Sequence, residues 1–270
     1  MKAESMTDLE TVVRAVACSR KYRAVCPDTV ARLGAMELAI HGDPGVAIKE
    51  TKGKLHQIYA AFEGRIDYGR AYHQLEAAYT TRRESQIKSA CMELMKLHTS
   101  TRERLPILDD FFEDIFRLTG RPKTLLDLGC GLCPLAVSWM DLPRGARYYA
   151  YDIDLNRIRL LNHYFHLAGL PQLAFCHDIL SRPPGIGADV AFLLKTSPCL
   201  EHQEKSGTLR LLDALLTQYV VVSFAVKSLG GREKGMLAHY EHSFLALVHG
   251  RNWAVTKVVF DTELVFIVKK

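Results

Sequence analysis

The chain has 270 residues, of which 48% are hydrophobic and 24% charged, and its formal net charge at pH 7 is +5. This length and apolar content are enough for one large domain, or for a domain with an extension, around a buried core. No window approaches the roughly eighteen uninterrupted apolar residues of a membrane span. Residues 1–5 are polar and lack the apolar core of a secretion signal. We therefore expect neither a membrane protein nor a secreted one.

Seven cysteines, an odd number without paired spacing, are typical of reduced thiols rather than of a disulfide framework. We therefore expect a cytoplasmic protein. Cys130 and Cys133 have the spacing of half a zinc site, but no second pair follows. The sequence thus predicts no metal site.

The first hundred residues have helical periodicity and no strand pattern. Thr7 or Asp8 is a candidate N-cap for the first helix, and Pro27 is a candidate first-turn residue for the second. The predicted helices begin at about residue 8, run over 27–41, follow the turn 43–45 and stop near Gly64, and then cover 68–79 and 84–97. None of them carries the spacing of a catalytic constellation.

Basic residues are concentrated in this helical part, because residues 1–105 hold 17 Lys and Arg against 13 Asp and Glu, whereas the remaining 165 residues hold 18 against 17. Such clusters can form a phosphate-facing surface, although solvated helix faces would explain each of them equally well. The candidate RNA-binding residues are Arg20, Lys21, Lys49, Lys52, Lys54 and Arg65.

The next segment, residues 98–105, precedes a predicted helix over 106–118. Ser100 and Glu103 have the spacing of a capping box, which indicates a helix start. The arginines of this segment permit a second role, because a guanidinium binds a carboxylate through two hydrogen bonds.

A strand, a glycine turn and a helix follow over residues 124–140, and the chain is organised around this unit. An apolar run ends at Gly129 and Gly131, where the absence of a Cβ lets a ligand approach the backbone closely. About twenty residues later a second apolar run ends at Asp152, which is where a βαβ unit places a carboxylate for ribose hydroxyls.

Two cofactors compete for such a unit, and a structural turn without a ligand is a third possibility. A dinucleotide fold favours a third glycine after Gly131, but Pro134 occupies that place. Asp127 puts negative charge where a pyrophosphate would lie. A cationic ligand suits this charge better, and S-adenosylmethionine carries a sulfonium and an ammonium group, so we favour the methyl donor.

Strands and helices alternate through the rest of the chain. The predicted strands are 124–128, 147–151, 172–176, 189–194, 218–225, 253–260 and 263–268, and the predicted helices are 133–140, 155–167, 201–215 and 236–249. This order predicts a mainly parallel sheet covered on both faces, with a final antiparallel hairpin. Ligands of such sheets bind beyond the carboxyl ends of the strands, where Asp178, Ile179, Lys195 and Phe224 also fall.

The chain resembles the aminoglycoside-resistance 16S ribosomal RNA (guanine-N7)-methyltransferases over nearly its whole length. The residues that carry the resemblance are the segments 98–104, 126–131, 151–154, 194–196, 228–232 and 234–236. The resemblance implies a Rossmann-like S-adenosylmethionine-dependent methyltransferase fold, an α/β fold with a seven-stranded mixed sheet, in residues 106–270. It also implies that the helical domain, residues 1–105, docks on 16S rRNA in the 30S ribosomal subunit.

The resemblance further implies that Arg104 holds the carboxylate of the cofactor, Asp152 its ribose and Asp178 its adenine. The full set of predicted cofactor-binding residues is His98, Thr101, Arg104, Asp127, Gly129, Gly131, Asp152, Ile153, Asp178, Ile179 and Lys195. The target would be a decoding-site guanine, and we expect the protein to act as a monomer.

Guanine N7 has a free lone pair, so methyl transfer to it needs no general base; it needs alignment and exclusion of water. N7 lies on an edge that side chains reach poorly in A-form RNA, which favours a flipped-out base. The residues predicted to hold that base are Phe224 by stacking, and Ser228, Arg232 and Lys234 by contacts to its edge and phosphate. A small-molecule methyltransferase and a non-catalytic RNA-binding protein remain as alternatives.

Overall fold

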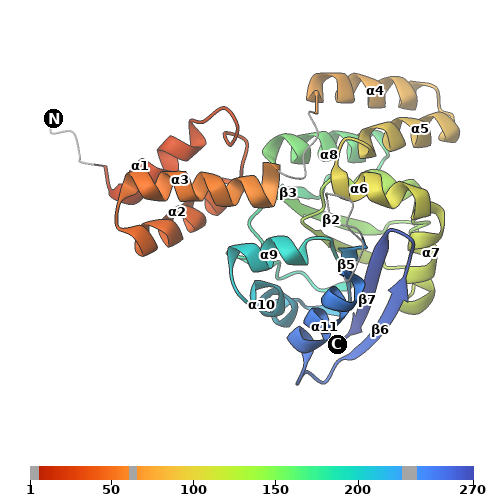
Figure 1. Ribbon diagram of the computed structural model, residues 1–270. Helices are drawn as coiled ribbons and strands as arrows, with labels where there is room; N and C mark the ends of the chain where they lie inside the picture. The colour runs from red at the N-terminus through yellow and green to blue at the C-terminus, as the bar shows by residue number, and fades with distance from the viewer. Residues whose placement is uncertain (1–5, 61–65, 227–235) are drawn as a thin grey trace.

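The computed structural model describes residues 6–60, 66–226 and 236–270. Three helices, α1 (Asp8–Ala17), α2 (Pro27–His41) and α3 (Pro44–Leu55), form a unit at one side of the molecule, which we call the N-terminal platform (Figure 1). A π-helical turn, His56–Ala60, extends α3. The platform has its own apolar core of buried residues: Val16, Tyr22, Val25, Val30, Leu33, Leu55 and Tyr59.

The ends of the platform helices follow local sequence rules. Thr7 and Glu10 form a reciprocal capping box at the start of α1. Prolines occupy the first turns of α2 and α3, where no backbone N–H is needed. Gly42 ends α2 with a φ of 68°, which favours glycine. The helix starts predicted at about residue 8 and at Pro27 are thus confirmed, whereas α3 begins at Pro44, within the turn predicted over 43–45.

The next two helices, α4 (Tyr68–Thr80) and α5 (Glu84–Met95), pack against the sheet domain instead of the platform. Leu75 of α4 and Leu94 of α5 belong to the same buried cluster as the strands. The apolar packing therefore groups α4 and α5 with the residues that follow. Among the described helices, none combines the length and apolarity that crossing a membrane requires.

Seven strands form one mixed sheet in the order β3-β2-β1-β4-β5-β7-β6, which confirms the predicted fold class. The pairs among β1 to β5 are parallel, whereas β7 pairs antiparallel with both β5 and β6. Their bounds are β1 (Thr124–Leu128), β2 (Arg147–Asp152), β3 (Ala174–Cys176), β4 (Ala188–Leu194), β5 (Thr217–Ala225), β6 (Ala254–Val259) and β7 (Glu263–Lys269).

Alternate residues of the central strands enter two different cores, as the two-residue period of a strand requires. In β4, Val190 and Phe192 pack on one face, whereas Ala191 and Leu193 pack on the other. The first face is covered by α4, α5, α7 (Leu108–Thr119), α8 (Leu155–Leu167) and the 3-10 helix η3 (Cys133–Trp139). The second is covered by α10 (Gly207–Ala214) and α11 (Met236–Val248), with α9 (Ser197–Gln203) beside them (Figure 1).

Two sequence predictions of local structure are wrong. The single helix expected over 201–215 is broken, because the Glu201 carboxylate accepts hydrogen bonds from the backbone N–H groups of Ser206 (2.8 Å) and Thr208 (2.9 Å) and so caps a new helix, α10. The capping box expected at Ser100 and Glu103 is absent. Helix α6 (Thr99–Arg104) begins two residues earlier than that box requires, with His98 as an N-cap that makes no side-chain capping bond.

Candidate functional site at the carboxyl edge of the sheet

A cleft lies at the carboxyl ends of the parallel strands, where a sheet of this topology binds its ligands. Segments far apart in the sequence line it: the π-helical turn after α3, the start of α6, and the loops after β1, β2, β3 and β4. The lining residues predicted from the sequence are His98, Gly129, Asp152, Ile153, Asp178, Ile179 and Lys195. The cleft therefore lies at the edge of the sheet that the sequence predicts, the edge formed by the carboxyl ends of the parallel strands.

The glycine turn after β1 is required by close packing within the protein. Gly129 and Gly131 have φ angles of 69° and 53°, which side-chain-bearing residues rarely adopt. A Cβ on Gly129 would lie 2.6 Å from Cγ2 of Thr196, and one on Gly131 would lie 2.7 Å from Cε1 of His98. The turn thus brings the segments before α6 and after β4 directly against β1.

Asp152 at the end of β2 is held as an ionised carboxylate. Its oxygens accept hydrogen bonds from the backbone N–H groups of Gly131 (2.9 Å) and Asp154 (3.0 Å), and from Nη1 of Arg157 (2.7 Å). Burial would raise the pKa of this carboxyl, but the positive charge of Arg157 and these hydrogen bonds outweigh burial and lower it. A carboxylate that remains charged and lines the cleft is suited to accept bonds from hydroxyl groups.

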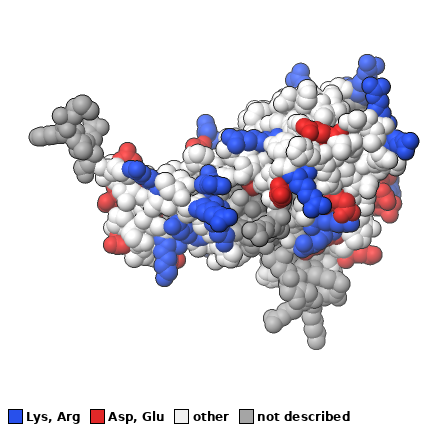
Figure 2. All heavy atoms as spheres, turned by 90° about the horizontal axis from the view of Figure 1, so that it is seen from above, with Lys and Arg blue, Asp and Glu red and all other residues white. Residues whose placement is uncertain are grey.

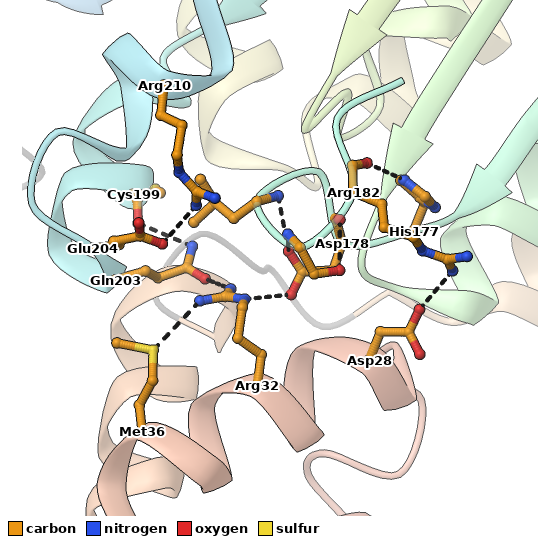
Figure 3. A network of polar contacts seen from close by, with 12 residues as sticks. Asp28, Arg32, Met36, His177, Asp178, Arg182, Cys199, Gln203, Glu204 and Arg210 are labelled. Carbon is orange, nitrogen blue, oxygen red and sulfur yellow. Dashed lines mark hydrogen bonds and ion pairs between the residues drawn. The ribbon is translucent and has the colours of Figure 1, made fainter. Parts of the chain in front are cut away.

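Asp178 after β3 is also a buried carboxylate of the cleft. Its Oδ1 accepts hydrogen bonds from the backbone N–H groups of Leu180 (2.9 Å) and Ser181 (3.1 Å). Its Oδ2 accepts one from Nε of Arg32 (2.9 Å), a residue of helix α2 in the N-terminal platform (Figure 3). The two carboxylates thus mark two positions along the cleft, beside the apolar side chains of Ile153 and Ile179.

His98 lines the cleft as a neutral imidazole. Burial and the nearby charge of Arg157 lower its pKa to about 3. Its Nδ1 atom is buried and has no hydrogen-bond partner among the described residues. A buried ring nitrogen without a partner, in a side chain that lines a cleft, is a position that a polar group of a ligand can satisfy.

Lys195, which lines the cleft, belongs to a compensated cluster of four charged residues. Glu263 at the start of β7 is fully buried; its Oε1 lies 2.8 Å from Nε of Arg104 and 3.2 Å from Nζ of Lys195. Nη2 of Arg104 donates to Oε2 of Glu263 (3.1 Å), and Lys195 also pairs with Glu103 (2.8 Å). Because each charge has a partner of opposite sign, the cluster fixes α6, β4 and β7 relative to one another.

The backbone of Lys195, directly after β4, is in the left-handed region with a φ of 59°. Its backbone N–H donates to the carbonyl of Ser223 on β5 (2.9 Å), which holds this conformation. A left-handed residue without glycine's freedom costs on the order of 1–3 kcal/mol and is often found at functional sites.

Several predicted cofactor residues support the cleft without lining it. Asp127 is buried beneath the glycine turn and accepts a hydrogen bond from the hydroxyl of Tyr148 (2.6 Å). Burial raises its pKa to about 6. Thr101 donates to the carbonyl of Met95 (2.6 Å), and Gly131 acts through its bond to Asp152. The negative charge facing a ligand therefore comes from Asp152 and Asp178 and not from Asp127.

The residues predicted to hold a target base are only partly described. Phe224 is 5% exposed and stacks on Tyr240 with ring centroids 4.8 Å apart, so one face of its ring is already covered. The other three, Ser228, Arg232 and Lys234, lie outside the described residues, as does Arg65.

The remaining basic residues gather at one end of the platform. The loop after α1 and the C-terminal half of α3 lie side by side, because the hydroxyl of Tyr22 donates to the carbonyl of Lys52 (3.0 Å) and Nζ of Lys21 lies 3.0 Å from Nδ1 of His56. Lys54 is paired with the buried Glu37 at 2.5 Å. Lys49 and Lys52 have no carboxylate partner within the described residues. In the view of Figure 2, Lys and Arg side chains are spread over the platform and the body of the molecule, with Asp and Glu side chains among them.

Sequence reasoning missed the residues that organise the two carboxylates and the charged cluster: Arg157, Arg32 and Glu263. Arg157 lies five residues after Asp152, in the first turn of α8, and this spacing could have indicated that the two side chains pair. Arg32 is 146 residues from Asp178 in the sequence, and Glu263 is 159 residues from Arg104, so no local pattern marks either residue.

Comparisons with known proteins agree with this geometry. The model of the family described as ribosomal RNA methyltransferase (FmrO) matches residues 18–267. A 16S rRNA (guanine(1405)-N(7))-methyltransferase of Micromonospora echinospora is 37% identical over 265 residues, covering 97% of each chain. One of the same name from Micromonospora rosea is 38% identical over 270 residues, again 97% of each chain. The crystal structure of the 16S rRNA methyltransferase RmtF in complex with S-adenosyl-L-homocysteine has a TM-score of 0.83 and 31% identity, and the match covers 98% of this chain and 99% of that one.

The seven-stranded sheet and the cleft at its carboxyl edge are those of an S-adenosylmethionine-dependent methyltransferase. The donor set fits that cofactor, since it combines acceptor carboxylates, apolar side chains and an unpartnered buried imidazole nitrogen. The family match covers most of the chain. The chain therefore belongs to the FmrO family of ribosomal RNA methyltransferases.

Proposed function

We propose that this protein transfers a methyl group from S-adenosylmethionine to N7 of guanine 1405 in 16S rRNA and so confers resistance to aminoglycosides. The observation that carries the proposal is the near-complete coverage of relatives with this activity, at 37% and 38% identity, together with a cleft that has the matching donor set. We further propose that it acts as a monomer in the cytoplasm on the assembled 30S subunit.

The cleft residues would bind the cofactor at separate points. Asp152, whose pKa is lowered, would accept hydrogen bonds from the ribose hydroxyls, and Asp178 would accept one from the adenine amino group. Ile153 and Ile179 would cover the adenine ring. His98 and Lys195 line the side of the cleft nearest α6, where the methionine end would lie. For Arg104 to hold the methionine carboxylate, it must reach from below the cleft, because Glu263 engages two of its nitrogens.

Methyl transfer to guanine N7 requires alignment of the reacting atoms and no proton transfer. The bound cofactor supplies an electrophilic methyl group, and guanine N7 is an acceptor with a free lone pair. The residues of the cleft fit this requirement, because burial and the charge of Arg157 lower the pKa of His98 to about 3, which makes its imidazole a weak base. Asp152 and Asp178 would place negative charge near a cationic cofactor, and the protein would exclude water from the reacting atoms.

The N-terminal helical domain, residues 1–105, would dock on the ribosomal subunit. Within it, the segment that holds Arg20 and Lys21 lies beside the segment that holds Lys49 and Lys52, through the contacts of Tyr22 and His56. This arrangement supports a phosphate-binding surface on the platform. The packing of α4 and α5 into the sheet domain supports α1–α3 as the part of this segment that would contact the subunit. A flipped guanine would then be held beyond β5, by residues that include Phe224, Ser228, Arg232 and Lys234.

The test is to incubate purified 30S subunits with the protein and a radiolabelled methyl donor, and to map the modified base by primer extension. We expect label at guanine 1405 of 16S rRNA in the assembled subunit. Matched incubations with Asp152→Asn protein measure background. Methylation at another nucleotide, or turnover of a small molecule without ribosomal particles, would contradict the proposal.

A further inference from the structure

Arg32 of helix α2 contacts two residues that line the cleft, Asp178 and Gln203 (Figure 3). Its Nε donates to Oδ2 of Asp178 (2.9 Å), and its Nη2 donates to Oε1 of Gln203 on α9 (2.5 Å). Nη1 lies 3.8 Å from the sulfur of Met36, one turn further along α2. The Arg32 side chain is 15% exposed and Asp178 is 3% exposed, so this ion pair is largely shielded from solvent.

The hydrogen bonds of Asp178 leave one defined acceptor position. Oδ1 accepts two backbone N–H bonds, from Leu180 and Ser181, which uses both of its lone pairs. Among the described residues, Oδ2 accepts a bond from Arg32 alone, which leaves one lone pair of this oxygen for a ligand. Because the guanidinium is planar and is also held by Gln203, it fixes the direction in which that lone pair points.

We propose that Arg32 is a positioning residue for cofactor recognition: it orients Oδ2 of Asp178 so that the carboxylate selects a ligand that carries an amino group on its purine ring. This inference rests on the proposed function, in which Asp178 faces the adenine. Adenine, with its exocyclic amino group, satisfies the free lone pair. A purine without that donor leaves it unsatisfied in a buried position.

A purely structural role, in which Arg32 fastens the platform to the sheet domain, predicts something different. Other contacts already join the two units. The backbone N–H of Cys26 donates to the carbonyl of Ile153 (2.7 Å), and that of Leu155 donates to the carbonyl of Ala24 (2.9 Å). Arg182 of the sheet domain pairs with Asp28 of α2 (2.9 Å), at side chains that are 71% and 49% exposed. The Arg182 side chain links the same two units as Arg32, but through Asp28 and not through the Asp178 carboxylate. The backbone N–H of Arg182 donates to the carbonyl of Asp178 (3.1 Å), a bond that alanine keeps, so Arg182→Ala is the matched control.

The experiment measures binding of two ligands to the full chain by calorimetry: S-adenosylhomocysteine, and the analogue with hydrogen in place of the 6-amino group. The parent protein should prefer the first. Arg32→Ala should lose about tenfold or more in affinity for S-adenosylhomocysteine, the worth of one hydrogen bond to a charged group. Its affinity for the analogue should stay within about twofold of the parent's, and Arg32→Lys should recover part of the loss, because an ammonium can still reach the carboxylate.

The outcomes separate the two proposals. Equal losses for both ligands in Arg32→Ala, or the same loss in Arg182→Ala, would show a structural link between the units and overturn the inference. Unchanged binding of S-adenosylhomocysteine by Arg32→Ala would overturn it as well. If the folded parent protein binds neither ligand, the proposed function itself fails.

Discussion

Replacing Gly129 by alanine tests whether the turn after β1 is shaped by packing within the protein. The new Cβ would lie 2.6 Å from Cγ2 and 2.9 Å from Oγ1 of Thr196, closer than real Cβ contacts. It would also have to adopt a φ of 69°. Both Gly129 and Thr196 line the cleft, so any shift of Thr196 moves the wall of the cofactor site.

The expected magnitude follows from two separable costs. The left-handed backbone costs about 1–2 kcal/mol for an alanine, and overpacking costs about 1–3 kcal/mol more, so Gly129→Ala should lower the free energy of unfolding by about 2–5 kcal/mol. Gly145 isolates the first cost, because its φ is 78° and a Cβ there would have no neighbour within 4 Å. Gly145→Ala should therefore lose only about 1–2 kcal/mol.

Thr196→Ala provides the double-mutant cycle. It removes both close atoms and leaves Cβ of residue 196 at 3.4 Å from the new methyl group. Urea unfolding of the four variants should show that Gly129→Ala costs about 1–3 kcal/mol less in the Thr196→Ala background. Affinity for S-adenosylhomocysteine should fall in Gly129→Ala and recover in the double variant. A Gly129→Ala cost equal to that of Gly145→Ala, with no recovery, would refute the packing argument.

Three further predictions concern charge. Asp152→Asn should weaken S-adenosylhomocysteine binding about 10- to 100-fold in calorimetry, since bonds to a charged group are lost; unchanged affinity would show that the ribose lies elsewhere. Lys49→Ala with Lys52→Ala should make the slope of log K against log salt for 30S binding shallower by about one to two units in a filter-binding series, and an unchanged slope would remove the docking role. Lys54→Ala, which takes the lysine partner from the buried Glu37 and leaves His41, should mainly lower the thermal midpoint. Burial and a neighbouring cation lower the pKa of His98 from 6.5 to about 3, so the folded state binds fewer protons than the unfolded state between these pH values. The free energy of unfolding should therefore fall as the pH falls from 6.5 toward 3. His98→Asn should flatten this pH dependence in urea unfolding, and an unaltered dependence would show that the imidazole is not buried in its neutral form.

Much of the fold could be predicted because its signals are local. The apolar runs of β1 and β2, the prolines that start α2 and α3, and the glycine that ends α2 each act within a few residues. The rule that ligands bind at the carboxyl ends of parallel strands then placed Asp152 and Asp178 in one cleft.

The missing part of the site is non-local. Whether Asp127 faces a ligand or lies beneath the turn depends on Tyr148, a residue of the neighbouring strand, which holds its carboxylate. Glu263 enters the charged cluster only because β7 inserts antiparallel between β5 and β6. The sequence indicated one helix over 201–215. Periodicity carries no information that the Glu201 carboxylate interrupts it by accepting bonds from the N–H groups of Ser206 and Thr208.

The most direct test of the account is a crystal structure of the protein with S-adenosylhomocysteine. We expect the ligand in the cleft, with the ribose hydroxyls within hydrogen-bond distance of Asp152 and the adenine amino group facing Oδ2 of Asp178. Between α9 and α11 lies another cavity, lined by His202, Phe224 and Tyr240 among others. Ligand density in that cavity, or with the adenine away from Asp178, would contradict the account.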